Sequence, residues 1–381
     1  MPPTPLPSAL PAAREQTRAF FAALPRSARI VVFCHFDADG LGAGAVFGRA
    51  LPRMGFTDVR VVPSGRGENA FTDAARERLR ALSPDALVIT DLGVNREGVL
   101  EGVPTLYVDH HRPDGEPAEA TIVLGYGWEP IPASAWLAYE ILRPLAPIDD
   151  LSWIAAVGTM SDLGDKAPWD ELPELRKRWT AKWLREAVSA VNAARRASAF
   201  DVQTPLDLLM HAGHPRELTE GDSAEVERLR GYRAEVQAEL AEARRSAPLF
   251  SATQPWALVP LDSPCQIHPL IAQQWRGRLK GHAVIAANRG YLPGIVAFSA
   301  RTSRPGLVLP ELLRAVDIGP VGHEFGRGHD QASGGQLPIA QFNRLVDALG
   351  FDERARVGEG PKRTGGENAG DDGPGPASAG G

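Results

Sequence analysis

The hydrophobic residues of the first 150 positions fall into short continuous runs that alternate with amphipathic stretches. The runs are rich in Val and Ile and cover residues 28–35, 58–64, 85–92 and 104–110. Helical spacing of apolar positions follows in residues 40–51, 70–83, 132–142 and 151–160. Continuous apolar strands separated by helices predict a parallel, doubly wound α/β sheet.

The second half of the chain begins with a long helical pattern. Residues 173–247 include a charged amphipathic stretch at 223–246, which is typical of a spacer between domains. A second alternation follows, with strand patterns at 256–262, 282–288 and 294–301 and helical patterns at 268–279 and 339–350. The sequence therefore predicts two lobes, the second a smaller α/β domain, joined by a helical linker.

The two ends of the chain differ from the rest in composition. Residues 1–15 are rich in Pro and Ala, and the end of the chain is a Gly-rich polar tail that cannot form a core. The predicted organisation is a disordered N-terminus (1–15), a first α/β domain (16–199), a helical linker (200–250), a second α/β domain (251–352) and a disordered tail (353–381).

Composition limits the classes of function. Of 381 residues, 43% are hydrophobic and 23% are charged, as in ordinary soluble globular proteins. The two cysteines exclude a disulfide framework, and no apolar run reaches the length of a membrane span, so a cytoplasmic protein is expected. The net charge of −6 argues mildly against a long polyanion and for a short phosphate ligand.

Acidic and imidazole side chains follow three of the predicted strands and one predicted helix. His35, Asp37 and Asp39 occupy alternate positions after the first strand, so an extended segment would place them on one side. A single acidic strand end is more often a solvated turn or a helix cap. Strand ends of one parallel sheet converge, however, which would bring together a larger set: His35, Asp37, Asp39, Asp91, Asp109, His110, His111, Asp162 and Asp165.

Such a cluster requires cations, because crowded carboxylates repel one another. Oxygen ligands with imidazole suit Mn²⁺ or Mg²⁺, and zinc-finger spacing is absent from the sequence. With about six ligands, a two-metal centre that hydrolyses phosphoesters is the favoured interpretation.

Four blocks of sequence together strongly resemble the DHH phosphoesterase superfamily. These are "HFDADG" at 35–40, the strand-end Asp91, "VDHH" at 108–111 and "GTMSD" at 158–162. In the second lobe, "GRGHDQASGG" at 326–335 resembles the GGGH-type motif of the associated substrate-binding domain. The segment 191–198 is similar to the one where family members leave the catalytic domain. The resemblance covers residues 28–350.

The resemblance implies roles for individual residues. Asp91 would bridge two ions, His111 would lie near the substrate phosphate and assist the leaving oxygen, and Asp109 would orient a histidine. Asp165 has no counterpart, and Cys34 is expected to be a buried apolar residue. The implied metal ligands are His35, Asp37, Asp39, Asp91, His110 and Asp162.

In the second lobe the resemblance gives Gly326, Arg327, Gly328 and His329 the task of holding a substrate phosphate. Arg327 stands where the family commonly has glycine, and it would either clamp the phosphate or crowd the pocket. Arg301, at a predicted strand end, is a second candidate for phosphate contact, and a surface arginine is an equal alternative. The remaining histidines match no motif and are expected to be structural: His211, His214, His268, His282 and His323.

The form "HFDADG" resembles the branch of the RecJ-type enzymes, whereas other branches more often have Pro where this chain has Ala38. No region after the GRGH motif is long enough for the oligonucleotide-binding barrel of a full RecJ enzyme. A pyrophosphatase would not need the second lobe. The sequence therefore predicts a phosphodiesterase or exonuclease with two Mn²⁺ ions, or Mg²⁺ in their place, acting on short single-stranded oligonucleotides or small dinucleotides.

Several alternatives stay open at this point. Within the enzymes they are a RecJ-like single-stranded DNA exonuclease, a cyclic or linear dinucleotide phosphodiesterase and a pAp phosphatase. A non-catalytic nucleotide-binding sensor is the alternative of another class, disfavoured because every metal-ligand position is filled. The expected partner is a short single-stranded nucleic acid or nucleotide, with no membrane, and a homodimer is left open.

Overall fold

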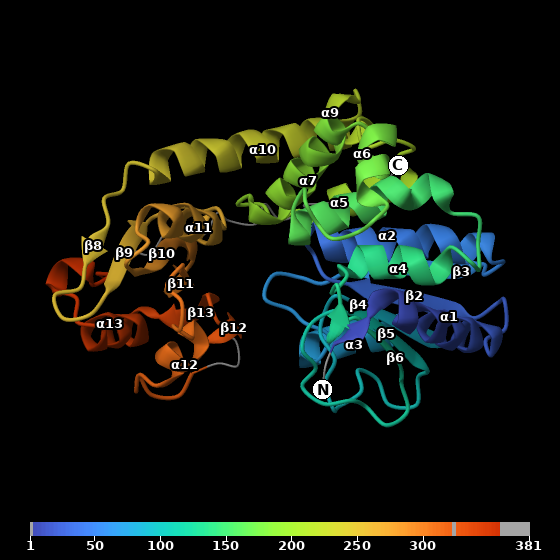
Figure 1. Ribbon diagram of the computed structural model, residues 1–381, viewed down its shortest axis with the longest axis horizontal. Coiled ribbons are helices and arrows are strands. Elements are labelled where there is room, and N and C mark those ends of the chain that lie inside the picture. Colours follow the sequence, from blue (N-terminus) through green and yellow to red (C-terminus); the bar gives the residue numbers. More distant parts are fainter. Residues whose placement is uncertain (1–2, 322–324, 359–381) are drawn as a thin grey trace, which may run out of the picture. The chain divides into compact units, whose positions relative to one another are not determined.

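The structure is a computed structural model that describes residues 3–321 and 325–358. The chain divides into two compact units, residues 1–241 and 242–381 (Figure 1). Each unit has its own sheet, and this confirms the predicted two-lobed α/β fold. No helix within the described ranges combines the length and the apolar character that crossing a membrane requires.

The first unit is built on a five-stranded parallel sheet with the strand order β3-β2-β4-β5-β6. Alternate residues of β2 enter two different cores: Ile30 and Val32 on one face, Val31 and Phe33 on the other. Because both faces are covered, the strands read as continuous apolar runs. The bounds are β2 Arg29–Cys34, β3 Asp58–Pro63, β4 Ala86–Thr90, β5 Thr105–Asp109 and β6 Thr121–Leu124. The sequence pattern missed β6, a short strand.

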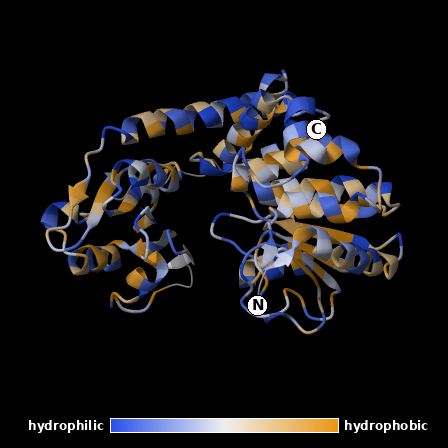
Figure 2. Ribbon diagram, in the orientation of Figure 1, coloured by the Kyte–Doolittle hydropathy of each residue, from blue (hydrophilic) through white to orange (hydrophobic). Residues whose placement is uncertain are grey.

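Helices cover both faces of this sheet. On one face α3 (Asp73–Ala81) packs Ala75 and Leu79 against the strands. The other face carries α2 (Ala38–Arg53), α4 (Ser134–Leu142) and α5 (Ser152–Leu163), which contact one another. Hydrophobic residues fill α2, α4 and the strands, as Figure 2 shows. The doubly wound arrangement is therefore as predicted.

The N-terminal segment differs from the expectation of disorder. Residues Leu6–Ala22 form helix α1, and Leu6, Leu10 and Ala13 are buried in the same core as α2 and α4. Arg14 in this helix forms an ion pair of 2.7 Å with Glu140 of α4. The short strand β1 (Thr4–Pro5) also pairs with β7 (Trp128–Glu129). Ala favours a helix, and Pro7 lies in the first turn, where its missing N–H has no helical partner, whereas Pro11 lies inside the helix.

The helices after α5 belong to the first unit as far as residue 241, so that unit takes in most of the segment expected as a linker. They are α6 (Leu172–Arg178), α7 (Ala181–Arg196), α8 (Gln203–His211), α9 (Glu217–Glu220) and α10 (Ala224–Ala243). A short 3₁₀ helix, η1 (Asp149–Leu151), precedes α5. In α10, Val226, Leu229 and Val236 are buried, while exposed residues form ion pairs along the helix, such as Arg230 with Glu227. It is therefore a half-buried amphipathic helix.

The second unit has a mixed sheet with the order β12-β13-β11-β10-β9-β8. Only β9 and β10 are parallel. The strands are β8 Leu249–Phe250, β9 Trp256–Leu261, β10 Ala283–Leu292, β11 Ile295–Thr302, β12 Arg327–His329 and β13 Ala332–Pro338. The helices are α11 His268–Arg278, α12 Leu309–Arg314 and α13 Ile339–Ala348, followed by the 3₁₀ helix η2 Glu353–Ala355. The part of the predicted tail beyond residue 358 lies outside the described residues.

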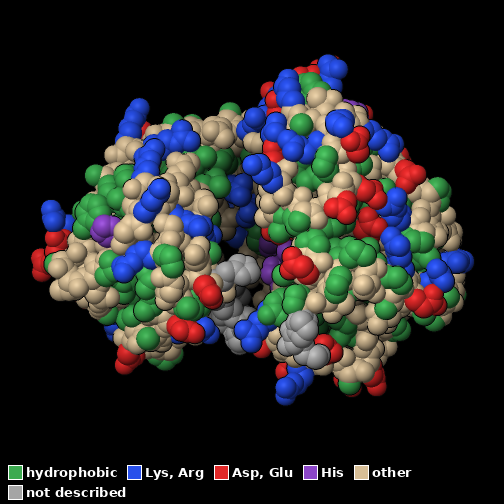
Figure 3. Space-filling model, viewed as in Figure 1, with side chains coloured by type: hydrophobic (Ala, Val, Ile, Leu, Met, Phe, Trp, Pro, Cys, Tyr) green, Lys and Arg blue, Asp and Glu red, His purple; other side chains and the backbone are tan. Residues whose placement is uncertain are grey.

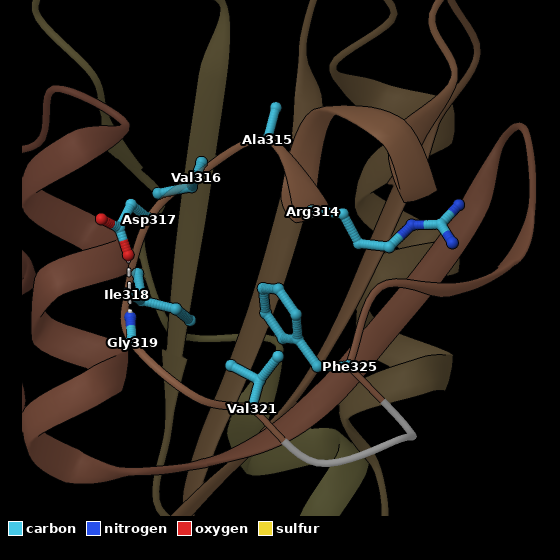
Figure 4. A pocket seen from close by; sticks show the side chains of 8 residues that line it. All are labelled: Arg314, Ala315, Val316, Asp317, Ile318, Gly319, Val321 and Phe325. Atoms are coloured by element: carbon cyan, nitrogen blue, oxygen red, sulfur yellow. Dashed lines mark hydrogen bonds between the residues drawn. The ribbon is translucent and has the colours of Figure 1, made fainter.

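A cavity of about 290 Å³ lies in the second unit, lined by the segment that follows α12 (Figure 4). Ile318, Val321 and Phe325 give it an apolar lining, and Asp317 uses its carboxylate to accept from the N–H of Gly319. The Arg314 side chain extends away from these apolar groups. The cavity therefore has the wrong chemistry for holding a phosphate.

Candidate metal centre

The carboxyl ends of β2, β4 and β5 meet at one edge of the first sheet. Cys34 at the end of β2 pairs with Thr90 of β4, and Thr90 pairs with Val108 of β5. The next residues along each strand direction are His35, Asp91 and Asp109. Parallel neighbours in this register bring the three strand ends side by side, as predicted.

Helix α2 begins within the same cluster. Asp37 is its N-cap, and Oδ1 accepts hydrogen bonds of 3.1 Å from the backbone N–H groups of Asp39 and Gly40. This satisfies two of the free donors at the start of the helix. Gly40 is required for close packing, because a Cβ there would lie 2.5 Å from the Cβ of His35. The "DADG" pattern is thus a helix start folded tightly against the preceding histidine.

Asp39 is held by a second helix N-terminus. Its carboxylate is 2% exposed and accepts from the backbone N–H groups of Ser134, at 2.7 Å, and Ala135, at 2.9 Å, in the first turn of α4. Gly158 of α5 faces it, and a Cβ there would lie 2.8 Å from Asp39 Oδ1. Three helices therefore fix the position of this one carboxylate.

Asp91 lies at the centre of the cluster. His35 Nδ1 is 3.4 Å from its Oδ2, while His110 Nε2 is 3.4 Å and His111 Nδ1 is 3.8 Å from its Oδ1. The Ser134 hydroxyl also donates to Oδ1 at 3.0 Å. The backbone of Asp91 has a φ of +60°, a left-handed conformation that is uncommon outside glycine and is often found at functional sites.

Asp162, near the end of α5, completes the arrangement, with Oδ2 at 3.7 Å from His110 Nδ1. Among the described residues, three groups place ligand atoms within 4.8 Å of one another. They are His35–Asp37–Asp91, Asp39–His110–Asp162 and Asp91–His110–His111. The first two groups contain all six residues that the family resemblance implies as ligands, and Asp91 and His110 each belong to two groups.

The ionisation of the cluster follows from this crowding. Burial disfavours the charged imidazoles, yet the adjacent carboxylates raise the pKa of His35 and of His110 to about 10. Against the same burial, the neighbouring histidines hold the pKa of Asp37 at about 2 and that of Asp91 below its ordinary range. Burial and the charge of Asp91 raise the pKa of Asp39, and burial likewise raises that of Asp162.

These directions describe carboxylates that need positive charge in a confined space. Without metal, protons on the histidines supply it; divalent cations would replace them. The donors are carboxylate oxygens and imidazole nitrogens, a set that suits Mn²⁺ or Mg²⁺. Cys34 is no ligand, since burial raises the pKa of its thiol and Sγ faces the carbonyl oxygen of Val62 at 3.8 Å. The residues present therefore fit divalent ions.

Asp109 and His111 form a pair at the edge of the cluster. Asp109 Oδ1 lies 2.9 Å from His111 Nδ1 and accepts from the His111 backbone N–H at 2.7 Å. Its Oδ2 accepts from the N–H of Gly93 at 2.7 Å. The buried carboxylate thereby fixes the orientation of the His111 ring. Asp165 lies outside the three groups and instead pairs with Arg176 and Arg185 on helices α6 and α7.

Sequence reasoning missed the residues that approach the cluster from elsewhere in the chain. Ser134, which contacts both Asp39 and Asp91, lies in a helix that the pattern identified only as a cover for the sheet.

Arg195 and Arg196 end α7, and the charge of Arg195 stabilises the Asp37 carboxylate. Burial, followed by Arg195, lowers the pKa of Arg196 to about 9, and within the described ranges Arg196 has no ion-pair partner. The two adjacent arginines in "VNAARRAS" were the feature of the sequence that could have indicated a basic group near the cluster.

Charge is otherwise mixed on the surface of the first unit. Over the face seen in Figure 3, basic and acidic side chains are interspersed. Arg195 and Arg196, by contrast, are half-buried near the Asp37 carboxylate.

In the second unit, the GRGH segment forms a strand. Arg327–His329 is β12, and Gly328 pairs with Ser333 of β13. Gly326 and Gly328 have φ values of +68° and +126°, and a Cβ on Gly328 would lie 2.2 Å from the carbonyl oxygen of Ala332. The backbone conformation therefore accounts for glycine at both positions. The side chains of Arg327 and His329, like all of His323, lie outside the described part of the structure.

Arg301 is half-buried in β11, beside this hairpin. Its Nη1 donates to the carbonyl oxygens of Ala300, at 2.9 Å, and Ser333, at 3.2 Å. Burial and the nearby charge of Arg276 lower its pKa. Arg276 in α11 donates to Gln331 Oε1 at 2.8 Å. Among the described residues neither arginine has an ion-pair partner, and each guanidinium donates to carbonyl oxygens of the backbone or of a side chain.

Comparison with known proteins gives a consistent fold. No family model matches the chain. In sequence, 173 residues are 28% identical to the single-stranded-DNA-specific exonuclease RecJ of Thermus thermophilus, a match that covers 41% of this chain. The matched region spans only 26% of that relative's length.

Solved structures match over a larger share of the chain. A structure of exonuclease RecJ bound to manganese has a TM-score of 0.65 at 22% identity, covering 89% of this chain and 93% of that one. A Mn²⁺ complex of Thermus thermophilus RecJ also scores 0.65, at 21% identity, over 88% of this chain and 54% of that chain. The DHH domain of a member of the s1p family of ribosomal proteins scores 0.64 at 16% identity, covering 91% of both chains. These likenesses establish the two-domain architecture.

Proposed function

We propose that this chain, which has the two-domain fold of the DHH superfamily, is a metal-dependent phosphodiesterase that hydrolyses nucleic-acid substrates from an end. The observation that carries the proposal is the convergence of six carboxylate and imidazole side chains into two adjoining groups at one sheet edge. A purely structural cluster of this kind would bury repelling carboxylates for no gain.

In this proposal His35, Asp37 and Asp91 hold one ion, and Asp39, His110 and Asp162 hold the other. Mn²⁺ is the expected metal and Mg²⁺ the alternative. Two of the similar RecJ structures hold manganese and a third holds magnesium, which supports the choice. When bound, two such ions neutralise charge on a phosphoryl group and activate water. Asp91 stands where it could serve both ions.

The protein's own groups supply the rest of the chemistry. The Asp109 carboxylate raises the pKa of His111 against the effect of burial, so the ring can carry a proton near neutral pH. With Nδ1 facing Asp109, the other nitrogen of this half-exposed imidazole is available to a substrate. We assign His111 the protonation of the leaving oxygen and Asp109 the orientation of His111.

Phosphate binding is assigned to guanidinium groups. Arg195 and Arg196 lie near Asp37 at the end of α7, and we assign them contact with a substrate phosphate at the metal cluster. In the second unit Arg301, with Arg276 as a neighbour, is proposed to bind a further phosphate. Gly326, Arg327, Gly328 and His329 remain assigned to the same task by the family resemblance.

Short single-stranded oligonucleotides or small dinucleotides are the proposed substrates, because the net charge of −6 disfavours a long polyanion. A RecJ-like exonuclease on longer single-stranded DNA is the second candidate, favoured by the sequence match to a protein of that activity. The same site is compatible with three other functions: a dinucleotide phosphodiesterase, a pAp phosphatase and a non-catalytic nucleotide sensor.

The test is hydrolysis, with Mn²⁺, of 5′-labelled single strands from dinucleotides to long oligomers, as DNA and RNA, with pAp alongside. We expect rapid cleavage of the shortest species. Stepwise shortening of long strands would favour the second candidate. Turnover of none of them with Mn²⁺ or Mg²⁺, combined with tight nucleotide binding, would replace the enzyme proposal by the sensor.

A further inference from the structure

Two phenylalanine rings lie next to the metal cluster outside the hydrophobic cores described for the first unit. Phe36 lies between His35 and Asp37, and its ring centroid is 5.2 Å from that of Phe200 in an edge-to-face contact. Both side chains are half-buried, and neither belongs to the two cores that cover the faces of the sheet. The phenyl pair therefore keeps part of its apolar area in contact with water beside the metal cluster.

Guanidinium groups cover part of the same pair. Arg66, from the loop after β3, lies over the Phe200 ring with its Cζ 5.0 Å from the centroid, and Arg195 lies 5.8 Å from the Phe36 centroid. Arg66 also donates to the carbonyl oxygen of Ser198 at 2.9 Å, which ties its loop to the segment that carries Phe200. Three separate segments of the chain thus converge on the two rings: the start of α2, the loop after β3 and the end of α7 with the residues that follow it.

The backbone at Phe200 is strained in order to hold the ring there. Its φ of +50° is rare for a bulky side chain. The neighbouring residue fixes this conformation, since Asp201 accepts from the N–H of Thr204 at 3.0 Å and from the Tyr232 hydroxyl at 2.8 Å. Strained residues persist where the surroundings determine them, and they concentrate at functional sites.

We propose that Phe36 and Phe200 form a stacking subsite for a nucleobase of the nucleotide whose phosphate lies at the metal cluster. Aromatic rings bind bases without regard to sequence, and adjacent guanidinium groups attract the backbone phosphates. The position is appropriate, because Phe36 is flanked in sequence by two cluster residues and its ring centroid lies 4.1 Å from that of His35. The inference rests on the proposed function, and it makes the site select nucleotides over phosphoesters that lack a base.

The test compares a thymidine trinucleotide with two analogues, in which the 5′- or the 3′-terminal nucleoside is replaced by abasic tetrahydrofuran. We expect the wild-type protein to lose about tenfold in kcat/KM when one of the two terminal bases is removed. In F200A this discrimination should fall to less than twofold, whereas F200W should restore it. The matched control is F250A, which removes a half-exposed ring in the second unit, far in sequence from the cluster. It should leave the discrimination unchanged.

Equal hydrolysis of all three substrates by the wild type would overturn the inference while leaving the proposed function intact. So would an equal loss in F200A on all three, which would mean a structural role for the ring. Absence of cleavage by the wild type would instead contradict the proposed function. Stacking is then measured without turnover, as the quenching of 2-aminopurine fluorescence in a trinucleotide bound in the presence of Ca²⁺. Quenching by the wild type but not by F200A supports the subsite. Equal quenching by both proteins rejects it.

Discussion

The hydroxyl group of Ser134 donates a 3.0 Å hydrogen bond to Oδ1 of Asp91, and both side chains are buried. The backbone N–H of the same serine donates to Asp39 at 2.7 Å. One residue of α4 therefore positions two carboxylates, one from the start of α2 and one from the end of β4. This contact joins the helical layer to the strand end that carries Asp91.

Replacing Ser134 by Ala should weaken activity more than stability. A hydrogen bond to a charged group contributes about 1.5–3 kcal/mol, so we expect kcat to fall by about tenfold or more. Thr17 provides the control, because its buried hydroxyl donates to the carbonyl oxygen of Ala13 far from the cluster. T17A should lower the melting temperature and leave kcat unchanged. An S134A enzyme with wild-type kcat would show that the hydroxyl does not position Asp91.

Replacing Asp91 by Asn, or His110 by Ala, should remove nearly all turnover. Each residue belongs to two of the groups of ligand atoms, so each change disturbs both proposed ions. We expect kcat to fall at least about a thousandfold, because the loss of metal chemistry is severe. Bound Mn²⁺ measured by mass spectrometry should fall in parallel. D165A, outside the cluster, is the control, and retained activity in D91N would refute the metal assignment.

Glycine 40 should not tolerate a side chain. A Cβ at this position would meet the Cβ of His35 at 2.5 Å, so G40A must displace either the histidine or the start of α2. We expect a loss of about 2 kcal/mol or more in the free energy of unfolding together with loss of activity. G98A is the matched control, since a Cβ there has no neighbour within 4 Å. Denaturant unfolding of both variants distinguishes a steric effect from a general effect of glycine replacement.

The metal-free protein should become less stable as the pH rises. His35 and His110 have a pKa of about 10 in the fold against 6.5 when unperturbed, so their contribution is complete below about pH 6.5 and is lost as the pH approaches 10. The raised pKa values of Asp39 and Asp162 act with the same sign. Metal should remove the dependence by replacing the protons.

Melting temperatures between pH 6 and 10, in EDTA and in Mg²⁺, check this expectation. The stabilisation by metal should grow with pH, and H110A should show a shallower decline in EDTA than the wild type. A metal-free melting temperature that rises from pH 6.5 to 9 would contradict the assigned ionisation.

Arg301 should affect binding more than chemistry. Its half-buried guanidinium has no carboxylate partner among the described residues, and R301A should raise KM about tenfold with kcat changed less than threefold. R289A, which removes an exposed arginine paired with Asp262, is the control and should change neither constant. An unchanged KM in R301A would assign Arg301 to the support of β11 and β13 alone.

Local sequence pattern determined much of this protein. Continuous Val- and Ile-rich runs are sufficient to identify β2, β4 and β5, because strands covered on both faces have apolar residues at every position. The parallel order then places His35, Asp91 and Asp109 at one edge. Asp162 was predicted to follow a buried helix, and it lies in the last turn of that helix, α5.

Tertiary structure alone decided which other groups reach the cluster. No hydrophobic periodicity marks Ser134 or Arg196 as part of the cluster. They reach it because the first turn of α4 packs against Asp39 and because α7 ends near Asp37. The Pro- and Ala-rich N-terminus became a helix for the same reason, since burial of Leu6 and Leu10 outweighs a weak local preference. Sequence pattern records which residues avoid water. Which distant residues meet depends on how the helices pack, and that is a property of the whole fold.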